Sequence, residues 1–353
     1  MSNIKLTIIK GNILEKIKEI PNESIDLCIT SPPYWALRDY GVEGQLGLEP
    51  SMEDYLDNMM KWVREVYRVL KPTGNFILNI GDCFIGGGRG GYTSETTCME
   101  KVNKSVPKPP SWKELKEKGT TDWKARSTPI SVVGNGCGIY KKKQLLSVSS
   151  FAYCRIISET DFVCRGEHVW CKPNTPTPVR SRLKHSHEKL FWFVKDSDKY
   201  FFDNSAWLKK LSSSSKERIK YPMKSLPCGL NGKRLLDENE ACTVARNENT
   251  IEHSWRIITI GEKQNGFELL DKKPSNEHIA PFPTKLIEPY IKSMCPVGGV
   301  VLDPFLGSGT TMRVAMENSR SCIGIELNPN YIEYTKKRLN WGAGLNIDYD
   351  LRE

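Results

Sequence analysis

The stretch Val300-Val-Leu-Asp-Pro-Phe-Leu-Gly-Ser-Gly-Thr-Thr-Met-Arg-Val-Ala315 decides the fold of this chain. A short apolar run ends in Asp303, a loop containing Gly307 and Gly309 follows, and the next helix begins at the threonine pair. Such a run, bounded by glycine and proline, is typical of a buried strand. Glycine lets the backbone of the loop pass close to a ligand, because it has no Cβ. The stretch therefore predicts a strand–loop–helix unit whose loop approaches a ligand.

The next apolar run, Ser321–Leu327, carries Glu326 near its end. An acid at the end of the second strand is well placed to accept hydrogen bonds from the two hydroxyls of a ribose. The loop before it lacks the lysine of a phosphate-binding loop, and Gly-Ser-Gly is not the dinucleotide fingerprint. A nucleoside without a pyrophosphate is the expected ligand, and the alternative is an ordinary strand-to-helix turn.

A second motif, Thr30-Ser-Pro-Pro-Tyr-Trp35, also follows an expected buried strand. Two consecutive prolines restrict φ and leave a rigid backbone with carbonyls in set directions. Tyr34 offers an aromatic face for stacking on a base, and Ser31 offers a hydroxyl. The motif could hold an exocyclic amine toward an electrophile. The alternative is a strand that ends in a turn with a buried aromatic side chain.

Strands and helices alternate on both sides of these motifs, which is the pattern of a parallel sheet with crossover helices. The fold class is therefore α/β. Strands are expected at 4–10, 24–30, 75–80, 168–173, 189–194, 300–303 and 321–326, and helices at 13–20, 55–70, 284–294, 310–318 and 329–339.

The middle of the chain carries its positive charge. The 353 residues have a net charge of +9, and the stretch 84–150 alone holds 12 basic and 5 acidic residues. An excess of Lys and Arg suits a polyanionic partner such as nucleic acid, although a basic surface is also common on soluble proteins. We expect five regions: 1–83, a basic flexible insertion at 84–150, further sheet strands at 151–203, a target-recognition region at 204–277, and 278–353.

Composition excludes several classes of protein. No apolar run reaches the length of a transmembrane helix, and the first twenty residues do not resemble a secretory signal. Eleven cysteines without an export signal favour reduced thiols and a cytoplasmic location. The spacing of Cys154, Cys164, Cys171 and His168 does not match a zinc site, so no metal is expected.

Taken together, the motifs at 303–311 and 30–35 resemble the amino-group DNA methyltransferases, which use S-adenosyl-L-methionine. The resemblance covers 1–83, 151–203 and 278–340. The Ser-Pro-Pro-Tyr motif comes before the cofactor motif, as in the β group, where the target-recognition region lies between them. This implies a Rossmann-like methyltransferase sheet with permuted motif order: 1–83 and 151–203 would form the catalytic half and 278–353 the cofactor-binding half.

The resemblance also implies a set of site residues. Asp303, Phe305, Gly307 and Gly309 would line the methionine side of the cofactor, Glu326 would hold its ribose, and Asn12 would lie near its adenine. The segment His278–Lys285 would close over the methionine carboxylate, with Lys285 as the charge partner. The full expected cofactor set is Asn12, Thr30, Pro283, Lys285, Asp303, Pro304, Phe305, Gly307, Ser308, Gly309, Thr310, Glu326 and Asn328. His187 and Glu188 resemble a later sheet motif, interpreted as structural.

The expected catalytic residues are Ser31, Pro32, Pro33 and Tyr34. In this family a serine at the first position is usual for N4-cytosine enzymes, and Asp or Asn for N6-adenine enzymes, so we favour N4-cytosine and keep N6-adenine as the alternative. C5-cytosine chemistry needs a Pro-Cys pair beside the active strand, where none occurs. The target base would be flipped from the duplex and stacked on Tyr34. Ser31 and the Pro32 carbonyl would accept hydrogen bonds from its amine.

Duplex DNA is the expected substrate, with a companion restriction endonuclease acting on the same site. The candidate DNA-contacting residues are Arg38, Lys141, Lys142, Lys143, Arg246 and Arg256. Either 204–277 or the insertion at 84–150 would read the bases, and the three lysines suit phosphate contacts. An RNA methyltransferase and a non-catalytic nucleic-acid-binding protein are the remaining alternatives. Retention of Asp303, Glu326 and the Ser-Pro-Pro-Tyr motif argues against a decayed enzyme.

Overall fold

A computed structural model describes residues 4–35, 37, 40–84, 144–172, 185–204, 258–259, 283–343 and 349–352. The chain divides into two compact units, one formed by Met1–Phe202 with Ile257–Glu353 and the other by Asp203–Arg256. Arg38, Lys141–Lys143, Arg246 and Arg256 lie outside the described residues, as do most of the expected regions 84–150 and 204–277.

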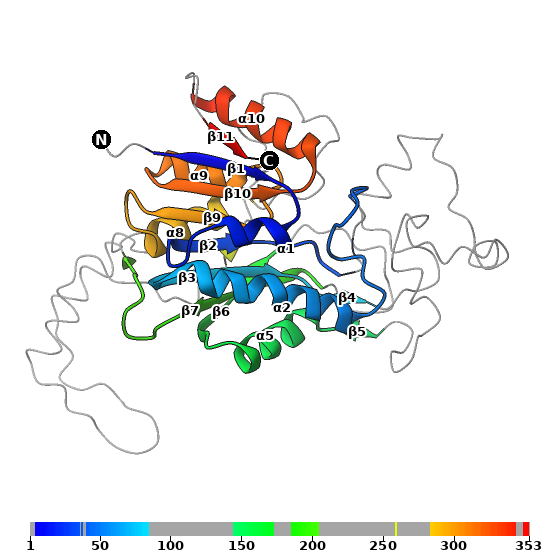
Figure 1. The fold of residues 1–353 in the computed structure, drawn as a ribbon. Coiled ribbons are helices and arrows are strands. Elements are labelled where there is room, and N and C mark those ends of the chain that lie inside the picture. The colour runs from blue at the N-terminus through cyan, green and yellow to red at the C-terminus, as the bar shows by residue number, and fades with distance from the viewer. Residues whose placement is uncertain are drawn as a thin grey trace, which may run out of the picture. The chain divides into compact units, whose positions relative to one another are not determined.

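Within the described residues, one nine-stranded sheet forms the centre of the first unit, in the order β11-β1-β10-β9-β2-β3-β7-β6-β8 (Figure 1). β7 runs antiparallel to both of its neighbours, and the other neighbouring pairs are parallel. The strands are β1 (Leu6–Lys10), β2 (Ile25–Thr30), β3 (Leu70–Ile80), β6 (Val163–Cys171), β7 (His187–Val194), β8 (Ile258–Thr259), β9 (Val300–Asp303), β10 (Ser321–Glu326) and β11 (Tyr349–Arg352). A separate pair is formed by β4 (Cys83–Phe84) and β5 (Leu145–Leu146).

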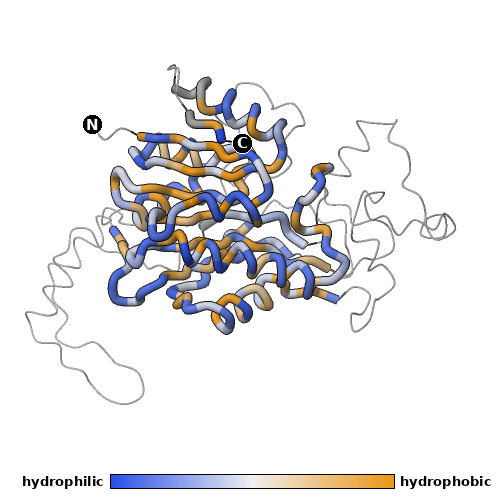
Figure 2. The backbone as a smooth tube through the Cα atoms, in the orientation of Figure 1, coloured by the Kyte–Doolittle hydropathy of each residue, from blue (hydrophilic) through white to orange (hydrophobic). Residues whose placement is uncertain are grey.

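Helices cover both faces of this sheet. In Figure 1, α1 (Ile13–Lys16) and α2 (Met52–Val69) lie in front of the sheet, whereas α8 (Thr284–Met294) and α9 (Thr310–Glu317) lie behind it. The 3-10 turn η1 (Ile17–Glu19) follows α1, α5 (Val148–Glu159) packs against α2, and α10 (Pro329–Ala343) contacts β1 and β10. The helix α2 is strongly amphipathic, with Trp62, Val63 and Val66 completely buried. Figure 2 shows hydrophobic residues along the central strands and alternation along α2, as expected for a sheet buried between helix layers.

The predicted α/β class is confirmed, and most predicted elements are present with small changes in their ends. The strand 300–303, the strand 321–326 and the helix 284–294 have the predicted ranges. The helix α2 begins three residues earlier than predicted, because the Ser51 side chain accepts a hydrogen bond from Asp54 N (3.0 Å) and caps it.

Several expectations were wrong. The helix predicted at 13–20 is a short α-helix continued by a 3-10 turn. The prediction missed α5, whose apolar residues lie on both faces, including the exposed Phe151, so helical periodicity is weak. It also missed β11, a short strand of mostly polar sequence that pairs with β1. Residues 145–150, placed in the flexible insertion, belong to β5 and the start of α5. Within the described residues, no helix has the length and apolar character needed to span a membrane.

Candidate active site

The carboxyl ends of β1, β10, β9 and β2 meet at one edge of the sheet. Parallel pairing aligns Lys10 with Glu326, and Gly324 with Asp303. β2 lies on the other side of β9, with Cys28 opposite Leu302. Two motifs separated by more than 250 residues of sequence are therefore neighbours in space. Ligands bind at this edge in open α/β sheets, where the strand order reverses.

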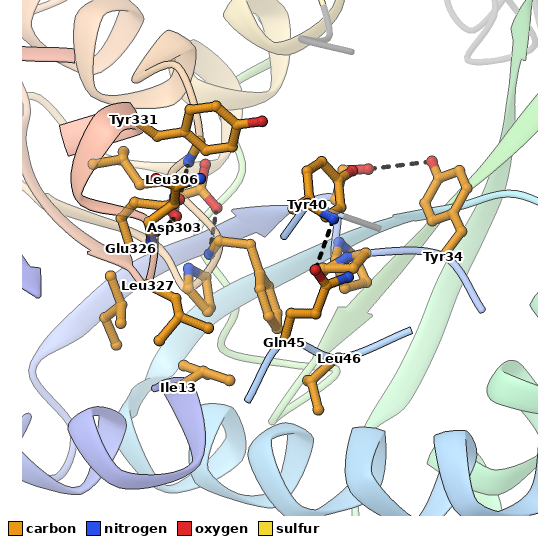
Figure 3. Close-up of a pocket in the computed structure, with 18 of the residues that line it drawn as sticks. Ile13, Tyr34, Tyr40, Gln45, Leu46, Asp303, Leu306, Glu326, Leu327 and Tyr331 are labelled. Carbon is orange, nitrogen blue, oxygen red and sulfur yellow. Dashed lines mark hydrogen bonds between the residues drawn. The ribbon is translucent and has the colours of Figure 1, made fainter. Parts of the chain in front are cut away.

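A cavity of about 380 Å³ opens at this edge. It is within the usual size range of ligand pockets. Of the predicted site residues, its wall includes Asn12, Ser31, Pro32, Pro33, Tyr34, Asp303, Pro304, Phe305, Gly307, Ser308, Thr310, Glu326 and Asn328. Figure 3 shows Asp303 and Glu326 together on one side of the cavity and Tyr34 on the other, with Tyr40 and Gln45 between them.

Four predicted cofactor residues do not line the cavity. Thr30 is completely buried beneath it and bonds Asp303. Pro283 is buried at the start of α8, and Lys285 is exposed on that helix. Gly309 has φ +72°, and a Cβ at this position would lie closer to Thr335 Cγ2 than van der Waals contact allows. The absence of a side chain at Gly309 therefore has two effects. It allows the left-handed backbone conformation, and it leaves room for Thr335 of α10 to pack closely.

Buried hydroxyl groups hold the Asp303 carboxylate in place. Asp303 is 1% exposed, Thr30 Oγ1 donates to its Oδ1 (2.7 Å), and Thr311 Oγ1 donates to its Oδ2 (2.6 Å). The amide of Phe305 adds a third bond to Oδ1 (3.1 Å). Burial raises the pKa of Asp303, and the bonds from Thr311 and Thr30 oppose this rise. The result is a fixed negative group at the floor of the cavity.

Glu326 is held by backbone amides. Gly307 N donates to its Oε2 and Asn328 N to its Oε1, both at 2.7 Å. Burial raises the pKa of Glu326 to about 7, although both amide bonds lower it. Each oxygen keeps a free lone pair on these contacts, so the carboxylate can accept two ligand hydroxyls. This donor set fits a ribose.

The wall of the cavity around Asn12 is formed by a loop and the start of a helix. Asn12 caps α1 by accepting from Leu14 N (2.9 Å), and its Nδ2 donates to Gly44 O (3.2 Å). The rings of Tyr40 and Tyr331 meet edge to face at 6.3 Å (Figure 3). An aromatic and apolar recess of this kind suits a flat heterocycle. Tyr331 was not predicted as a site residue.

At the opposite side of the cavity, Tyr34 joins a polar network. Ser31 Oγ donates to its hydroxyl (3.2 Å), which lies 2.8 Å from Glu188 Oε2 and 3.2 Å from Asn79 Oδ1. Burial raises the pKa of Tyr34 well above its usual value, and the Glu188 charge raises it further. Lys172 forms an ion pair with Glu188. Glu188, Lys172, Asn79 and Trp170 all line the cavity, and none was predicted as a functional residue.

Trp170 and Lys172 lie at the carboxyl end of β6, where Lys172 Nζ is 3.9 Å from the centre of the Trp170 ring. A weak signal in the sequence could have indicated this region: charged and aromatic residues occur close together at 167–172 and again at 188–192. The described residues contain no group of three or more His, Cys, Asp or Glu able to hold a metal ion.

The order of strands and the position of the two motifs define a methyltransferase-like site. Residues 25–337 match the family model described as DNA methylase (N6_N4_Mtase), so the chain belongs to this DNA methylase family. It is therefore a DNA methyltransferase, as predicted. The predicted cofactor, S-adenosyl-L-methionine, is confirmed through the family.

Curated relatives cover nearly the whole chain. Type II methyltransferase M.SmaI of Serratia marcescens is 31% identical over 333 residues, covering 94% of this chain and 90% of the relative. Type II methyltransferase M.Cfr9I of Citrobacter freundii is 30% identical over 342 residues, covering 97% and 89%.

Solved structures share the fold. The PvuII DNA methyltransferase, described as cytosine-N4-specific, aligns with a TM-score of 0.54 and 20% identity, covering 99% of both chains. TTHA0409 of Thermus thermophilus, solved in complex with S-adenosyl-L-methionine, aligns with a TM-score of 0.53 and 19% identity, covering 99% of this chain and 98% of that one.

Proposed function

We propose that this chain is a site-specific DNA methyltransferase that transfers a methyl group from S-adenosyl-L-methionine to N4 of a cytosine in duplex DNA. The observation that carries the proposal is that both motifs line the same cavity, with Ser31–Tyr34 from one motif and Asp303 from the other, together with Glu326. A nucleoside held by Glu326 and a base amine held by Ser31 would then be neighbours, and orientation of reacting groups is a large part of catalysis.

The residues present fit the cofactor. Glu326 would accept the ribose hydroxyls, the Tyr40–Tyr331 recess would take the adenine, and Asp303 with the 305–308 loop would face the methionine side. When bound, S-adenosyl-L-methionine supplies an electrophilic methyl group on a positively charged sulfur. The buried carboxylate of Asp303 and the half-buried carboxylate of Glu326 would give this side of the cavity a negative charge that suits such a ligand.

Ser31 supports cytosine as the target base. A serine hydroxyl, together with the Pro32 carbonyl, can accept hydrogen bonds from an amine while remaining neutral. In the resembling family this residue is usual for N4-cytosine enzymes, and the PvuII enzyme with the same fold is described as cytosine-N4-specific. Because a paired and stacked cytosine cannot reach a recessed cavity, the base would be flipped out of the helix.

A restriction endonuclease that cleaves the same sequence is the proposed companion. The support is that M.SmaI and M.Cfr9I are both named as Type II methyltransferases. Sequence recognition would fall to 204–277 or to 84–150, and the proposed location is the cytoplasm.

The test is mass spectrometry of nucleosides from unmethylated genomic DNA treated with the protein and S-adenosyl-L-methionine. We expect N4-methylcytosine. The Asp303→Ala variant, purified in the same way, controls for host methylases. N6-methyladenine would overturn the assignment of the base, and methylation of RNA in a parallel reaction with none on DNA would overturn the assignment of the substrate.

A further inference from the structure

Glu188 ends a chain of hydrogen bonds that begins at Ser31. Ser31 Oγ donates to the Tyr34 hydroxyl (3.2 Å), and that hydroxyl donates to Glu188 Oε2 (2.8 Å). The three side chains come from different parts of the chain: the segment after β2 for the first two, and the start of β7 for Glu188. All three line the same cavity. The chain of bonds therefore connects the proposed amine-binding hydroxyl with a carboxylate.

The direction of these bonds follows from the number of protons. The Tyr34 hydroxyl has one hydrogen and two nearby acceptors, Glu188 at 2.8 Å and Asn79 Oδ1 at 3.2 Å. A bond to a charged acceptor is shorter and stronger than one to a neutral amide. With its hydrogen directed to Glu188, the Tyr34 oxygen accepts from Ser31. The Ser31 oxygen then presents its lone pairs, and not its hydrogen, to a base amine.

The groups around Glu188 keep it in position. Lys172 Nζ pairs with its Oε1 and lies over the Trp170 ring. The Glu188 side chain is 16% exposed and that of Lys172 30%. Asn79 Nδ2 donates to Lys189 O (3.1 Å), which turns the Asn79 oxygen toward Tyr34. Lys189 itself pairs with Glu167 (3.3 Å). Among the residues that the structure describes, the titratable groups in contact with Glu188 are Tyr34 and Lys172.

We propose that Glu188 is a positioning residue of the methyl transfer and the final acceptor of the proton that the target amine loses. This rests on the proposed function. The amine lone pair forms the new nitrogen–carbon bond, and the carbon–sulfur bond breaks with its electron pair going to sulfur. The amine nitrogen, now positive, gives a proton to Ser31 Oγ. Ser31 passes its own proton to Tyr34, and Tyr34 passes its proton to Glu188, which becomes a neutral carboxylic acid.

This route conserves charge without any other reactant. The positive charge leaves the sulfur, appears on the amine nitrogen and is neutralised when its proton reaches the carboxylate. A methylated aromatic amine that carries the positive charge is a strong acid, so a carboxylate paired with lysine is basic enough to take its proton. Direct loss of the proton to water is the competing route, and it makes no use of Tyr34 or Glu188.

The test compares Glu188→Gln, Tyr34→Phe and the double variant with the wild type in single turnovers at saturating S-adenosyl-L-methionine. General acid–base groups typically contribute about 10²–10⁴-fold, so we expect each single variant to lose about 100-fold at neutral pH. The double variant should lose no more than either single one, because both interrupt one relay. Glu167→Gln, the same change at an exposed carboxylate on β6, should keep the wild-type rate.

The pH profile separates a proton acceptor from a structural role. A carboxylic acid that already holds its proton cannot accept another, and glutamine accepts none at any pH, so the ratio of the wild-type rate to the Glu188→Gln rate should fall toward one in acid. A ratio of rates that is constant with pH, or additive losses in the double variant, would overturn the proposal. Mass spectrometry of the product identifies the methylated base separately. Methyladenine in place of methylcytosine would overturn the proposed target base, but the comparison of the variants with the wild type would still test the relay for the adenine amine.

A readout without catalysis tests the contact itself. In protein carrying ¹³Cζ-tyrosine, the Tyr34 resonance is identified by its absence in Tyr34→Phe. We expect it to move in Glu188→Gln and to stay unchanged in Glu167→Gln, since the carboxylate accepts the Tyr34 proton. An unmoved resonance would overturn the relay even if the protein methylated no DNA.

Discussion

The Thr30 hydroxyl donates a 2.7 Å hydrogen bond to the Asp303 carboxylate, joining the two motifs of the candidate active site across 273 positions of sequence. Thr30 is the last residue of β2 and Asp303 the last residue of β9, and these strands are neighbours in the sheet. Both side chains are buried. The bond sets the segment that carries Ser31 against the loop that would hold the cofactor, so each motif positions the other.

The first prediction removes this bond. Thr30→Val keeps the shape of the side chain, and among the described residues it leaves Asp303 Oδ1 with the Phe305 amide as its donor. Loss of one partner of a buried polar group costs about 1–3 kcal/mol. We expect a loss of this size in the free energy of unfolding, measured by urea titration, with weaker binding of S-adenosyl-L-methionine. Thr7→Val, at a buried threonine on β1 outside the cavity, should leave binding unchanged. Equal binding by both variants would contradict the positioning role of Thr30.

A second prediction concerns Gly309. A left-handed conformation costs a non-glycine residue about 1–2 kcal/mol, and a Cβ here would also clash with the Thr335 side chain. Gly309→Ala should therefore lower the free energy of unfolding by more than this strain alone. Gly41 is a matched control, because its φ is +70° and a Cβ there would meet nothing within 4 Å. Gly41→Ala should show the strain alone, and equal losses at the two positions would rule out the clash with Thr335.

Much of this arrangement follows from local sequence, and some of it does not. The strands ending at Thr30 and Asp303 are apolar runs stopped by proline or glycine, which is a local signal. Their adjacency in the sheet was implied only by the family resemblance, since chain order says nothing about which parallel strands pair. The sequence predicted a turn that needs glycine near Gly309. The close approach of Thr335 to this glycine could not be predicted, because it depends on how α10 packs.

Charged residues were the least predictable. Arg338 follows Lys336 and Lys337, and three basic residues in a row are typical of the solvent-exposed face of a helix. The Arg338 side chain is nevertheless buried, with 5% of its surface exposed. Glu188 was interpreted as structural from the family resemblance, yet it contacts Tyr34 and Lys172, which come from distant parts of the sequence. Lys285 was expected at the cofactor and is exposed outside the cavity. Such roles are set by tertiary packing, and no local period or spacing encodes them.

A third prediction follows from Arg338. Its Nη1 donates to Ser308 O (3.1 Å), to Ser308 Oγ (3.1 Å) and to Thr310 Oγ1 (2.8 Å), so it holds in place the loop that is proposed to face the cofactor. Arg338→Met should lower the free energy of unfolding by about 1–3 kcal/mol. It should also weaken binding of S-adenosyl-L-methionine about tenfold, which corresponds to about 1.4 kcal/mol.

Arg320 is the matched control for Arg338. Arg320 is also buried, at 7% exposed. It lies directly before β10, at the end of that strand opposite Glu326, and donates to Cys295 O. Arg320→Met should lose comparable stability in the same urea titration while keeping cofactor affinity, measured by calorimetry. If both variants bind the cofactor equally well, Arg338 contributes to folding only.

The last prediction is a pH dependence. Burial raises the pKa of Glu326 to about 7, from a usual value near 4.5. Between these values the folded protein holds a proton that the unfolded chain has lost, so Glu326 makes folding less favourable as the pH rises through that window, by at most about 3 kcal/mol. In the ligand-free protein, the free energy of unfolding should fall less between pH 4.5 and 7 in Glu326→Gln than in the wild type, because the variant has no carboxylate at this position.

Cofactor binding should depend on pH in the opposite sense. The ionised carboxylate is the form that accepts both ribose hydroxyls, so affinity for S-adenosyl-L-methionine should fall as the pH drops below about 7, approaching tenfold per unit. Calorimetry of the wild type and Glu326→Gln between pH 5.5 and 8.5 measures this, and the variant should bind weakly with little pH dependence. Glu333→Gln, at an exposed glutamate on α10 paired with Lys336, should behave like the wild type. If Glu326→Gln kept the wild-type pH profile, the ribose would have to be held by another group.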